Sequence, residues 1–168
     1  MRNVVSCIIP AYNEGPRIGT VLGVALASSH IDQVIAINDC SVDRTLVEMK
    51  KFSKNKKLKI INLRKNSGKS FAFAEGLAAA KGNVILMLDS DPRGLSGANI
   101  DSIIRPLLTG EADMTLSLRG NSAWIYKLLG IDFVSGERAL RRKILGNPLE
   151  MRKLARYGLE VFINSRFI

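Results

Sequence analysis

Short apolar runs alternate with segments of helical periodicity through the first half of the sequence, and this alternation restricts the possible folds more than any other feature. The apolar runs cover residues 4–9, 33–38, 58–63 and 84–88. Helical patterns fill the intervals, at residues 16–29, 41–52 and 69–80. Strands that alternate with helices over short links form parallel sheets with helices on both faces. The sequence therefore predicts an α/β fold with a Rossmann-like, mostly parallel central sheet flanked by helices.

The pattern is looser beyond residue 92. A helix is expected over residues 100–108 and a strand over 113–118, and the basic tail from residue 136 is expected to be mostly helical. The chain of 168 residues has the length of one domain and is long enough to bury a sizeable core. No internal repeat or linker divides it, so residues 1–168 are interpreted as a single domain.

The net charge of +10 is unevenly distributed. Residues 50–69 contain nine Lys or Arg and no acid, and residues 137–168 contain eight basic residues against three acidic ones. Such patches attract phosphates of a nucleotide, a nucleic acid or an anionic lipid. Single-stranded nucleic-acid sites interleave aromatic and basic residues, but Phe52 is the only aromatic residue within 50–69. We therefore expect no nucleic-acid partner, with a non-catalytic basic binding module kept as an alternative.

Cellular location is inferred from cysteine usage and hydropathy. Cys7 and Cys40 match no metal-binding spacing, which favours structural thiols in a reducing compartment. No apolar run approaches the length needed to span a bilayer. A cytoplasmic protein is expected, with any membrane contact peripheral and at the inner face.

Polar side chains follow three of the four apolar runs. Tyr12 and Glu14 follow the first run, Asp39 the second, and Asp89-Ser-Asp91 the fourth. Parallel strands bring their carboxyl ends to one sheet edge, where open α/β folds bind ligands. Two adjacent carboxylates repel each other unless a cation lies between them or they face water. Two interpretations of Asp89-Ser-Asp91 therefore remain. The segment is either a solvated turn or part of a diphosphate site with Mg²⁺ or Mn²⁺, ions that prefer oxygen ligands.

Gly68-Lys69-Ser70 has the last residues of a phosphate-binding P-loop. The full pattern requires a glycine five residues before Gly68, where this sequence has Leu63. The P-loop NTPase class is therefore excluded. Lys69 at the start of a helix remains a plausible phosphate contact, because the helix dipole and free N–H groups add to its charge.

Four motifs, taken in order, resemble those of a known family. They are residues 8–14 (IIPAYNE), 38–43 (NDCSVD), 66–69 (NSGK) and 89–91 (DSD). With them the chain resembles the family 2 glycosyltransferases, whose fold is the nucleotide-diphospho-sugar transferase fold, called GT-A. It looks similar to dolichol-phosphate mannose synthase and its polyprenyl-phosphate relatives, with glucosyl-3-phosphoglycerate synthase close by. The resemblance implies a donor-binding half at about 1–92 and an acceptor half at about 93–168, short for the family.

On the donor side, the resemblance implies a nucleoside pocket lined by Pro10, Tyr12 and Glu14. It implies that Asp39 accepts a hydrogen bond from the base and that Lys69 binds the diphosphate. Asn38 replaces the first acid of the family's Asp-Asp pair and Cys40 replaces the glycine that follows it. The choice between uridine and guanosine donors therefore stays open.

The resemblance also implies a metal ion and an acceptor site. Asp91 is the expected main ligand of Mg²⁺ or Mn²⁺ and a catalytic residue, and Asp89 is expected near the ribose, the sugar and the metal. Glu137 is the expected base for a hydroxyl acceptor, with a helix-start acid as the alternative interpretation. Three arginines are expected to orient a phosphorylated acceptor by charge-assisted hydrogen bonds: Arg138, Arg141 and Arg142.

These observations predict a metal-dependent, inverting hexosyltransferase. The expected donor is a UDP- or GDP-sugar, and the expected acceptor is phosphorylated, with a polyprenyl or dolichyl phosphate at the membrane surface as first choice. A small phosphorylated acceptor, as in glucosyl-3-phosphoglycerate synthase, is the alternative. A nucleotidyltransferase is disfavoured because its glycine-rich basic loop after the first strand is missing. The sugar, the base, the acceptor and the oligomeric state are not predicted.

Overall fold

The computed structural model describes residues 2–92, 94–117, 137–154 and 158–166. The amino-terminal part alternates strictly between strands and helices: β1 (Val5–Ala11), α1 (Gly15–Ala27), β2 (Gln33–Asn38), α2 (Thr45–Lys50), β3 (Leu58–Asn62), α3 (Lys69–Ala79) and β4 (Val84–Met87). The later elements are α4 (Gly97–Thr109), β5 (Met114–Leu116), β6 (Arg138–Arg141), α6 (Arg142–Leu145), α7 (Pro148–Met151) and α8 (Gly158–Ser165).

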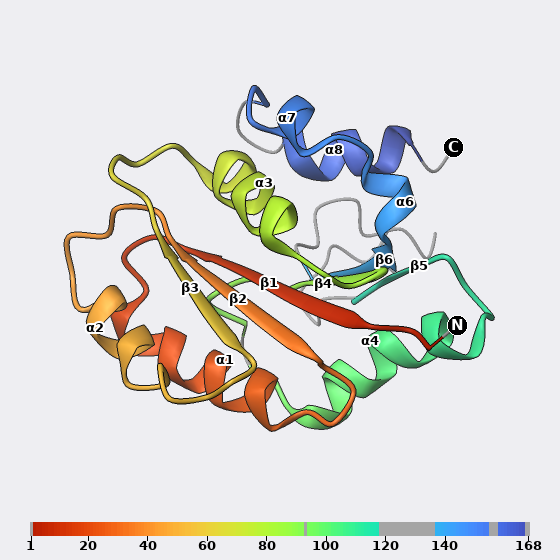
Figure 1. Ribbon diagram of the computed structural model, residues 1–168, viewed down its shortest axis with the longest axis horizontal. Coiled ribbons are helices and arrows are strands. Elements are labelled where there is room, and N and C mark those ends of the chain that lie inside the picture. The colour runs from red at the N-terminus through yellow and green to blue at the C-terminus, as the bar shows by residue number, and fades with distance from the viewer. Residues whose placement is uncertain (1, 93, 118–136, 155–157, 167–168) are drawn as a thin grey trace, which may run out of the picture.

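One mixed sheet forms the centre of the molecule, with strand order β3-β2-β1-β4-β6-β5 (Figure 1). The first four strands are parallel, and β6 runs antiparallel to both β4 and β5. The predicted α/β fold with a mostly parallel sheet is confirmed. The order reverses between β1 and β4, the place where open α/β sheets form a crevice outside their carboxyl ends.

Helices cover both faces of the sheet. α1, α2 and α4 pack on one face, and α3 with α6, α7 and α8 packs on the other (Figure 1). Successive strand residues point to opposite faces, so Cys7 and Ile9 join the first core while Ile8 joins the second. Both faces are apolar because both are covered, which explains the nearly continuous apolar runs in the sequence.

β1 extends through Pro10 to Ala11, whereas the sequence predicted that Pro10 ends it. A proline inside a central strand normally removes a ladder hydrogen bond. Here Leu88 N donates to Ile8 O, so the backbone N–H and C=O of Ile8 point towards β4. The backbone of Pro10, two residues further on, points the same way, but β4 has already ended at Met87, opposite Ile8. The missing N–H therefore breaks no strand pairing.

The helix predicted over residues 41–52 begins later: α2 starts at Thr45, and the Ser41 hydroxyl instead accepts a hydrogen bond from Asn13 N at 3.0 Å. The described part of the tail is mostly helical, as predicted, but it also contributes a strand, β6, whose Ala139 and Leu140 are fully buried between strands. Pairing with β4 and β5 therefore makes this segment a strand, although its sequence, which begins and ends with arginine, has only a weak strand pattern.

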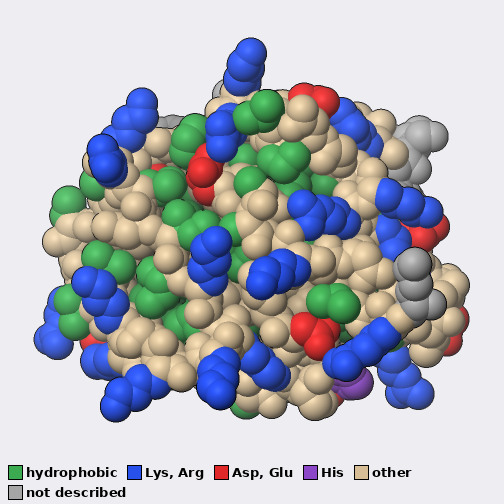
Figure 2. Space-filling model, viewed as in Figure 1, with side chains coloured by type: hydrophobic (Ala, Val, Ile, Leu, Met, Phe, Trp, Pro, Cys, Tyr) green, Lys and Arg blue, Asp and Glu red, His purple; other side chains and the backbone are tan. Residues whose placement is uncertain are grey.

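The basic residues expected from the sequence lie on the surface. Figure 2 shows many Lys and Arg side chains and few acidic ones on the face seen in Figure 1. Lys54, Lys56 and Lys59, at or next to the edge strand β3, are exposed. Charged side chains on an edge strand discourage pairing with another chain. Among the described residues, no helix is long and apolar enough to cross a membrane.

Gly76 allows α3 to pack closely on the sheet. A Cβ at this position would lie 2.5 Å from Ile8 Cγ2 and 2.8 Å from Ile37 Cδ1, both in the core. We expect Gly76→Ala to lower the free energy of unfolding by about 1–3 kcal/mol, because packed interiors tolerate added volume poorly. Gly23→Ala in α1 is the matched control, since its Cβ would meet nothing within 4 Å. Urea unfolding that showed equal effects for the two variants would contradict this explanation.

Candidate active site

A cavity of about 320 Å³ opens at the carboxyl edge of the sheet, next to the reversal of strand order. Residues at the end of β1 or in the segments that follow the parallel strands line it: Pro10, Ala11, Tyr12, Asp39, Lys69, Ala72, Asp89, Ser90 and Asp91. The strand-end residues singled out from the sequence therefore share one cavity, apart from Glu14. Three carboxylates and one ammonium group border a space large enough for a small ligand.

Asp39 holds the loop that precedes α3. Its Oδ1 accepts a hydrogen bond from Ser67 N at 2.8 Å, and its Oδ2 accepts one from Gly68 N at 2.7 Å. The residue is only 3% exposed. Gly68 adopts φ +87°, a left-handed conformation that glycine tolerates without strain, and α3 begins at the next residue. Asp39 therefore positions Lys69 at the edge of the cavity.

Lys69 is held between two carboxylates. Its Nζ lies 2.8 Å from Asp89 Oδ1 and 2.9 Å from Glu160 Oε1 of α8. Burial alone would lower the pKa of Lys69, but the charges of Asp89 and Glu160 and their hydrogen bonds outweigh burial and raise the pKa. The ammonium group is therefore charged at neutral pH. With 42% of its side chain exposed, Lys69 remains accessible from the cavity.

Glu160 is a site residue for which the sequence analysis had no role. It is 5% exposed, and it lies 91 positions from Lys69 in the chain. Its sequence signals are weak: a loose resemblance to the family, and an acid in the first turn of an amphipathic helix, which helix dipoles alone explain. The contact with Lys69 depends on the packing of α8 next to α3.

Asp91 differs from Asp89 in its surroundings. Asp91 is exposed and forms no hydrogen bond or ion pair with the described residues, whereas the Asp89 carboxylate binds Lys69. The described residues contain no cluster of three acidic, His or Cys side chains that would hold a metal unaided. Two carboxylates on one cavity fit Mg²⁺ or Mn²⁺, which usually takes one or two carboxylates together with substrate phosphates.

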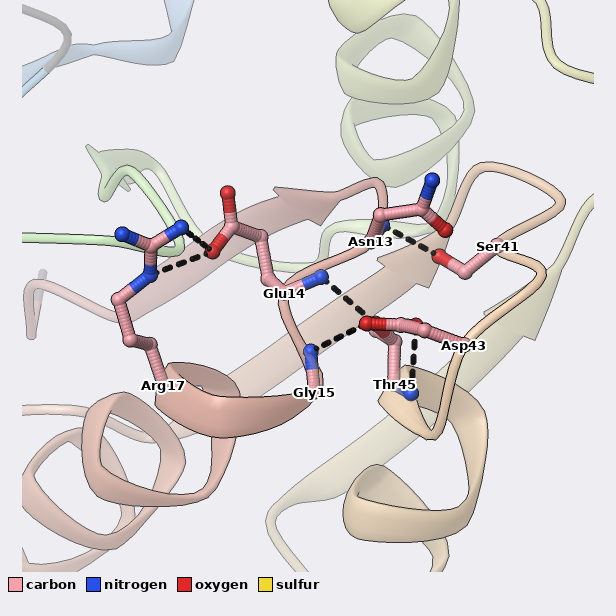
Figure 3. Close-up of polar contacts among 7 residues, drawn as sticks. All are labelled: Asn13, Glu14, Gly15, Arg17, Ser41, Asp43 and Thr45. Atoms are coloured by element: carbon pink, nitrogen blue, oxygen red, sulfur yellow. Dashed lines mark hydrogen bonds and ion pairs between the residues drawn. The ribbon is translucent and has the colours of Figure 1, made fainter.

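Two loops next to the cavity are joined by hydrogen bonds (Figure 3). Val42 N donates to Asn13 Oδ1 at 2.9 Å, and Glu14 N donates to Thr45 Oγ1 at 2.7 Å. The Glu14 carboxylate pairs with Arg17 at 2.6 Å, and Glu14 does not line the cavity. Its predicted place in a nucleoside pocket therefore stays a prediction.

Asp43 completes this junction by accepting hydrogen bonds from Gly15 N and Thr45 N, both at 2.9 Å (Figure 3). Desolvation would raise the pKa of Asp43, but these bonds and one from the Thr45 hydroxyl outweigh it and lower the pKa below its ordinary value of 3.8. A group with a depressed folded pKa contributes stability above its unfolded pKa and loses it as the pH falls through the folded value.

We therefore expect the Asp43 contribution to stability to be present above pH 3.8 and lost below it. Asp43→Asn should make the free energy of unfolding less dependent on pH below about pH 4 than in the unmodified protein. Chemical denaturation at a series of acidic pH values measures this slope. Equal slopes for the two proteins would show that the junction does not depend on this carboxylate.

The predicted acceptor residues lie in three different environments. Glu137 precedes β6, whose Arg138 lies opposite Met87, so Glu137 lies near the carboxyl end of β4 and the cavity. Residues 118–136, which precede it, lie outside the described residues. Arg138 is fully buried and donates to Asn164 Oδ1 of α8 at 3.1 Å. It therefore offers no exposed surface to an acceptor.

Arg141 and Arg142 lie at the opposite end of β4, where Arg141 pairs with Val84. Arg141 donates to Leu107 O, and Arg142 donates to the carbonyls of Leu77 and Ala80. Because β6 is antiparallel to β4, each residue after Arg138 lies further from the cavity. The predicted role of both arginines in holding an acceptor at the cavity does not fit this placement.

Comparisons with known proteins agree with this geometry. The computed fold matches the crystal structure of glucosyl-3-phosphoglycerate synthase from Mycobacterium tuberculosis with Mn²⁺, UDP-glucose and phosphoglyceric acid, at a TM-score of 0.76 and 24% identity, covering 96% of this chain and 64% of that one. The fold is therefore the GT-A type of nucleotide-diphospho-sugar transferases. The Glycosyl transferase family 2 model matches residues 6–119, and the chain belongs to that family.

Two curated relatives act on lipid phosphates according to their names. Dodecaprenyl-phosphate galacturonate synthase of Rhizobium johnstonii is 28% identical over 123 residues, covering 70% of this chain and 36% of the relative. Human dolichyl-phosphate beta-glucosyltransferase is 30% identical over 99 residues, covering 52% of this chain and 31% of the relative. The chain thus spans about a third of the length of these relatives.

Proposed function

We propose that this chain forms the donor site of an inverting glycosyltransferase that uses a UDP- or GDP-sugar and a divalent cation. The observation that carries the proposal is the single cavity shared by Asp39, Lys69, Asp89 and Asp91 at the carboxyl edge of the sheet. Membership of glycosyl transferase family 2 supports it.

The cavity provides groups suited to a diphosphate. Lys69 is the first residue of α3, and the first N–H groups of a helix have no partner within it. Together with the helix dipole, they favour a bound phosphate. Asp89 and Asp91 are placed to hold Mg²⁺ or Mn²⁺, which would neutralise charge on the departing diphosphate. Asp39 and Glu160 keep Lys69 in place through the contacts described above.

The proposed acceptor is phosphorylated, and a polyprenyl phosphate is the first choice because both curated relatives named above carry a polyprenyl or dolichyl phosphate in their names. A phosphate monoester is anionic at neutral pH and needs no strong base. A second candidate is a small phosphorylated acceptor. The likeness to glucosyl-3-phosphoglycerate synthase over 96% of this chain favours it, and Glu137 would then be the base for a hydroxyl group.

Calorimetric titration tests the donor site directly. We expect saturable binding of UDP or GDP in the presence of Mn²⁺ and loss of that binding when the metal is removed with a chelator. Failure of both nucleotides to bind at millimolar concentration would refute the donor proposal. Incubation of the corresponding nucleotide-sugar with polyprenyl phosphate or 3-phosphoglycerate, followed by mass spectrometry, then distinguishes the two acceptors.

The peripheral membrane contact expected from the sequence would use the basic segment 152–156 (RKLAR) and is tested separately. Arg152 pairs with Glu75 at 2.6 Å and lies 5.5 Å from the centre of the Phe71 ring, so it is engaged with α3. Arg156 lies outside the described residues. A peripheral contact with an anionic membrane therefore remains a proposal, and vesicle sedimentation tests it.

A further inference from the structure

A second hollow lies at the opposite end of the sheet from the candidate active site. It has a volume of about 620 Å³, and its lining includes Lys81, Asn83, Arg141, Arg142, Lys143 and Gly146. Arg141 pairs with Val84 at the start of β4, whereas Asp89 follows the end of the strand. Five residues of strand correspond to roughly 16 Å. The hollow is therefore separate from the donor cavity.

The lining of this hollow is strongly cationic. Four basic side chains border it, and the one carboxylate paired with any of them among the described residues is Asp113. Asp113 Oδ1 lies 3.6 Å from Arg141 Nε and 3.9 Å from Lys143 Nζ. A concave surface lined by one sign of charge concentrates ions of the opposite sign.

The two arginines form a fixed base for the hollow. Arg142 donates to the carbonyls of Leu77 and Ala80 at the end of α3, and Arg141 donates to Asn3 Oδ1 and Leu107 O. A guanidinium group has five N–H donors, so these bonds leave others for a ligand. Groups that are already held in place lose little conformational freedom when a ligand binds.

The lysines distinguish a binding site from a purely structural cluster. Fastening α3 and α4 to the sheet accounts for Arg142 and Arg141. It does not account for Lys81, which is exposed and forms no side-chain hydrogen bond or ion pair with the described residues, or for Lys143, whose side chain is 75% exposed. Both add positive charge to a hollow that already contains two guanidinium groups. A bound anion would relieve the repulsion between these charges.

We propose that this hollow binds a phosphate monoester or pyrophosphate group, independently of the donor cavity. Arginine and lysine in a concave pocket suit a compact, multiply charged anion. Among the described residues, the lining contains no aromatic side chain on which a base would stack, which disfavours single-stranded nucleic acid. The phosphate belongs either to a soluble small molecule or to a lipid headgroup, and the experiment separates the two.

The test compares two charge-matched double variants in calorimetric titrations with inorganic phosphate and pyrophosphate at physiological ionic strength. We expect Lys81→Gln with Lys143→Gln to weaken binding at least 10-fold. Lys54→Gln with Lys56→Gln, which removes the same charge from an exposed loop, should weaken it less than 2-fold. Lys69→Gln, at the donor cavity, should leave this binding event in place. Equal losses in the two double variants, or loss of the event in Lys69→Gln, would overturn the proposal.

Sedimentation with vesicles identifies the source of the phosphate. If the ligand is a lipid headgroup, phosphatidic acid vesicles should carry down the protein but not the Lys81 and Lys143 double variant, and phosphatidylcholine vesicles should carry down neither. If the ligand is soluble, pyrophosphate should bind and the two lysines should have no effect on sedimentation. Binding of neither the soluble anions nor the acidic vesicles would refute the site.

Discussion

Asp91→Ala is expected to weaken Mn²⁺-dependent binding of UDP or GDP at least about 100-fold, because loss of a direct metal ligand should cost no less than loss of a residue that supports one. Asp91 is exposed and forms no hydrogen bond or ion pair with the described residues, so its removal should leave stability nearly unchanged. The expected signature is therefore a large loss of metal-dependent affinity without a change in unfolding. Calorimetry and urea denaturation measure the two quantities on the same variant.

Asp101→Ala is the matched control, since it removes an exposed carboxylate from α4 without touching the cavity. It should bind nucleotide and Mn²⁺ as the unmodified protein does. If Asp91→Ala kept full metal dependence, the assignment of Asp91 as the main ligand would be wrong. The metal would then have to bind through Asp89 and the diphosphate alone.

Removal of the Asp89 carboxylate and removal of the Asp91 carboxylate should affect Lys69 differently. Asp89 is an ion-pair partner of Lys69, so replacing it changes both the metal site and the position of the ammonium group. Of the two carboxylates described as partners of Lys69, Glu160 alone would then remain. A variant of Asp89 therefore cannot separate metal binding from diphosphate binding. Asp91, which contacts neither Lys69 nor Glu160, gives the cleaner measurement.

Local sequence signals were sufficient for the parallel half of the fold. The apolar runs around Ile8, Ile35 and Ile85 are buried on both faces, so their composition alone marks them as strands. The polar residues that follow them meet at one edge because parallel strands share a direction. Tyr12, Asp39 and the Asp89-Ser-Asp91 segment accordingly line one cavity, as the sequence predicts.

Local sequence signals did not predict contacts between segments that lie far apart in the chain. β6 is short, begins and ends with arginine, and becomes a strand because it pairs with β4 and β5. The antiparallel direction of β6 carries Arg141 away from the cavity, although the sequence predicts Arg138 and Arg141 at one acceptor site. Glu160 was missed for a related reason: its role depends on a contact with Lys69 across 91 positions.

Asp39→Ala is expected to lower the free energy of unfolding by about 2 kcal/mol or more. Its carboxylate accepts backbone hydrogen bonds from both Ser67 and Gly68, and hydrogen bonds to charged groups contribute about 1.5–3 kcal/mol each. The alanine variant leaves Ser67 N without its acceptor and leaves Gly68 N with only its longer bond to Asn66 Oδ1, at 3.2 Å, just before α3. Urea unfolding followed by circular dichroism measures the loss.

Asp43→Ala provides the comparison, because Asp43 also accepts two backbone N–H bonds but is exposed. Water replaces an exposed acceptor more readily than a buried one, so Asp43→Ala should destabilise the protein less than Asp39→Ala. Asp39→Ala should also weaken nucleotide binding, since the loop it holds carries Lys69, whereas Asp43→Ala should leave the Lys69 contacts intact. If Asp39→Ala lost nucleotide binding without losing stability, the carboxylate would contact the base directly rather than position the loop.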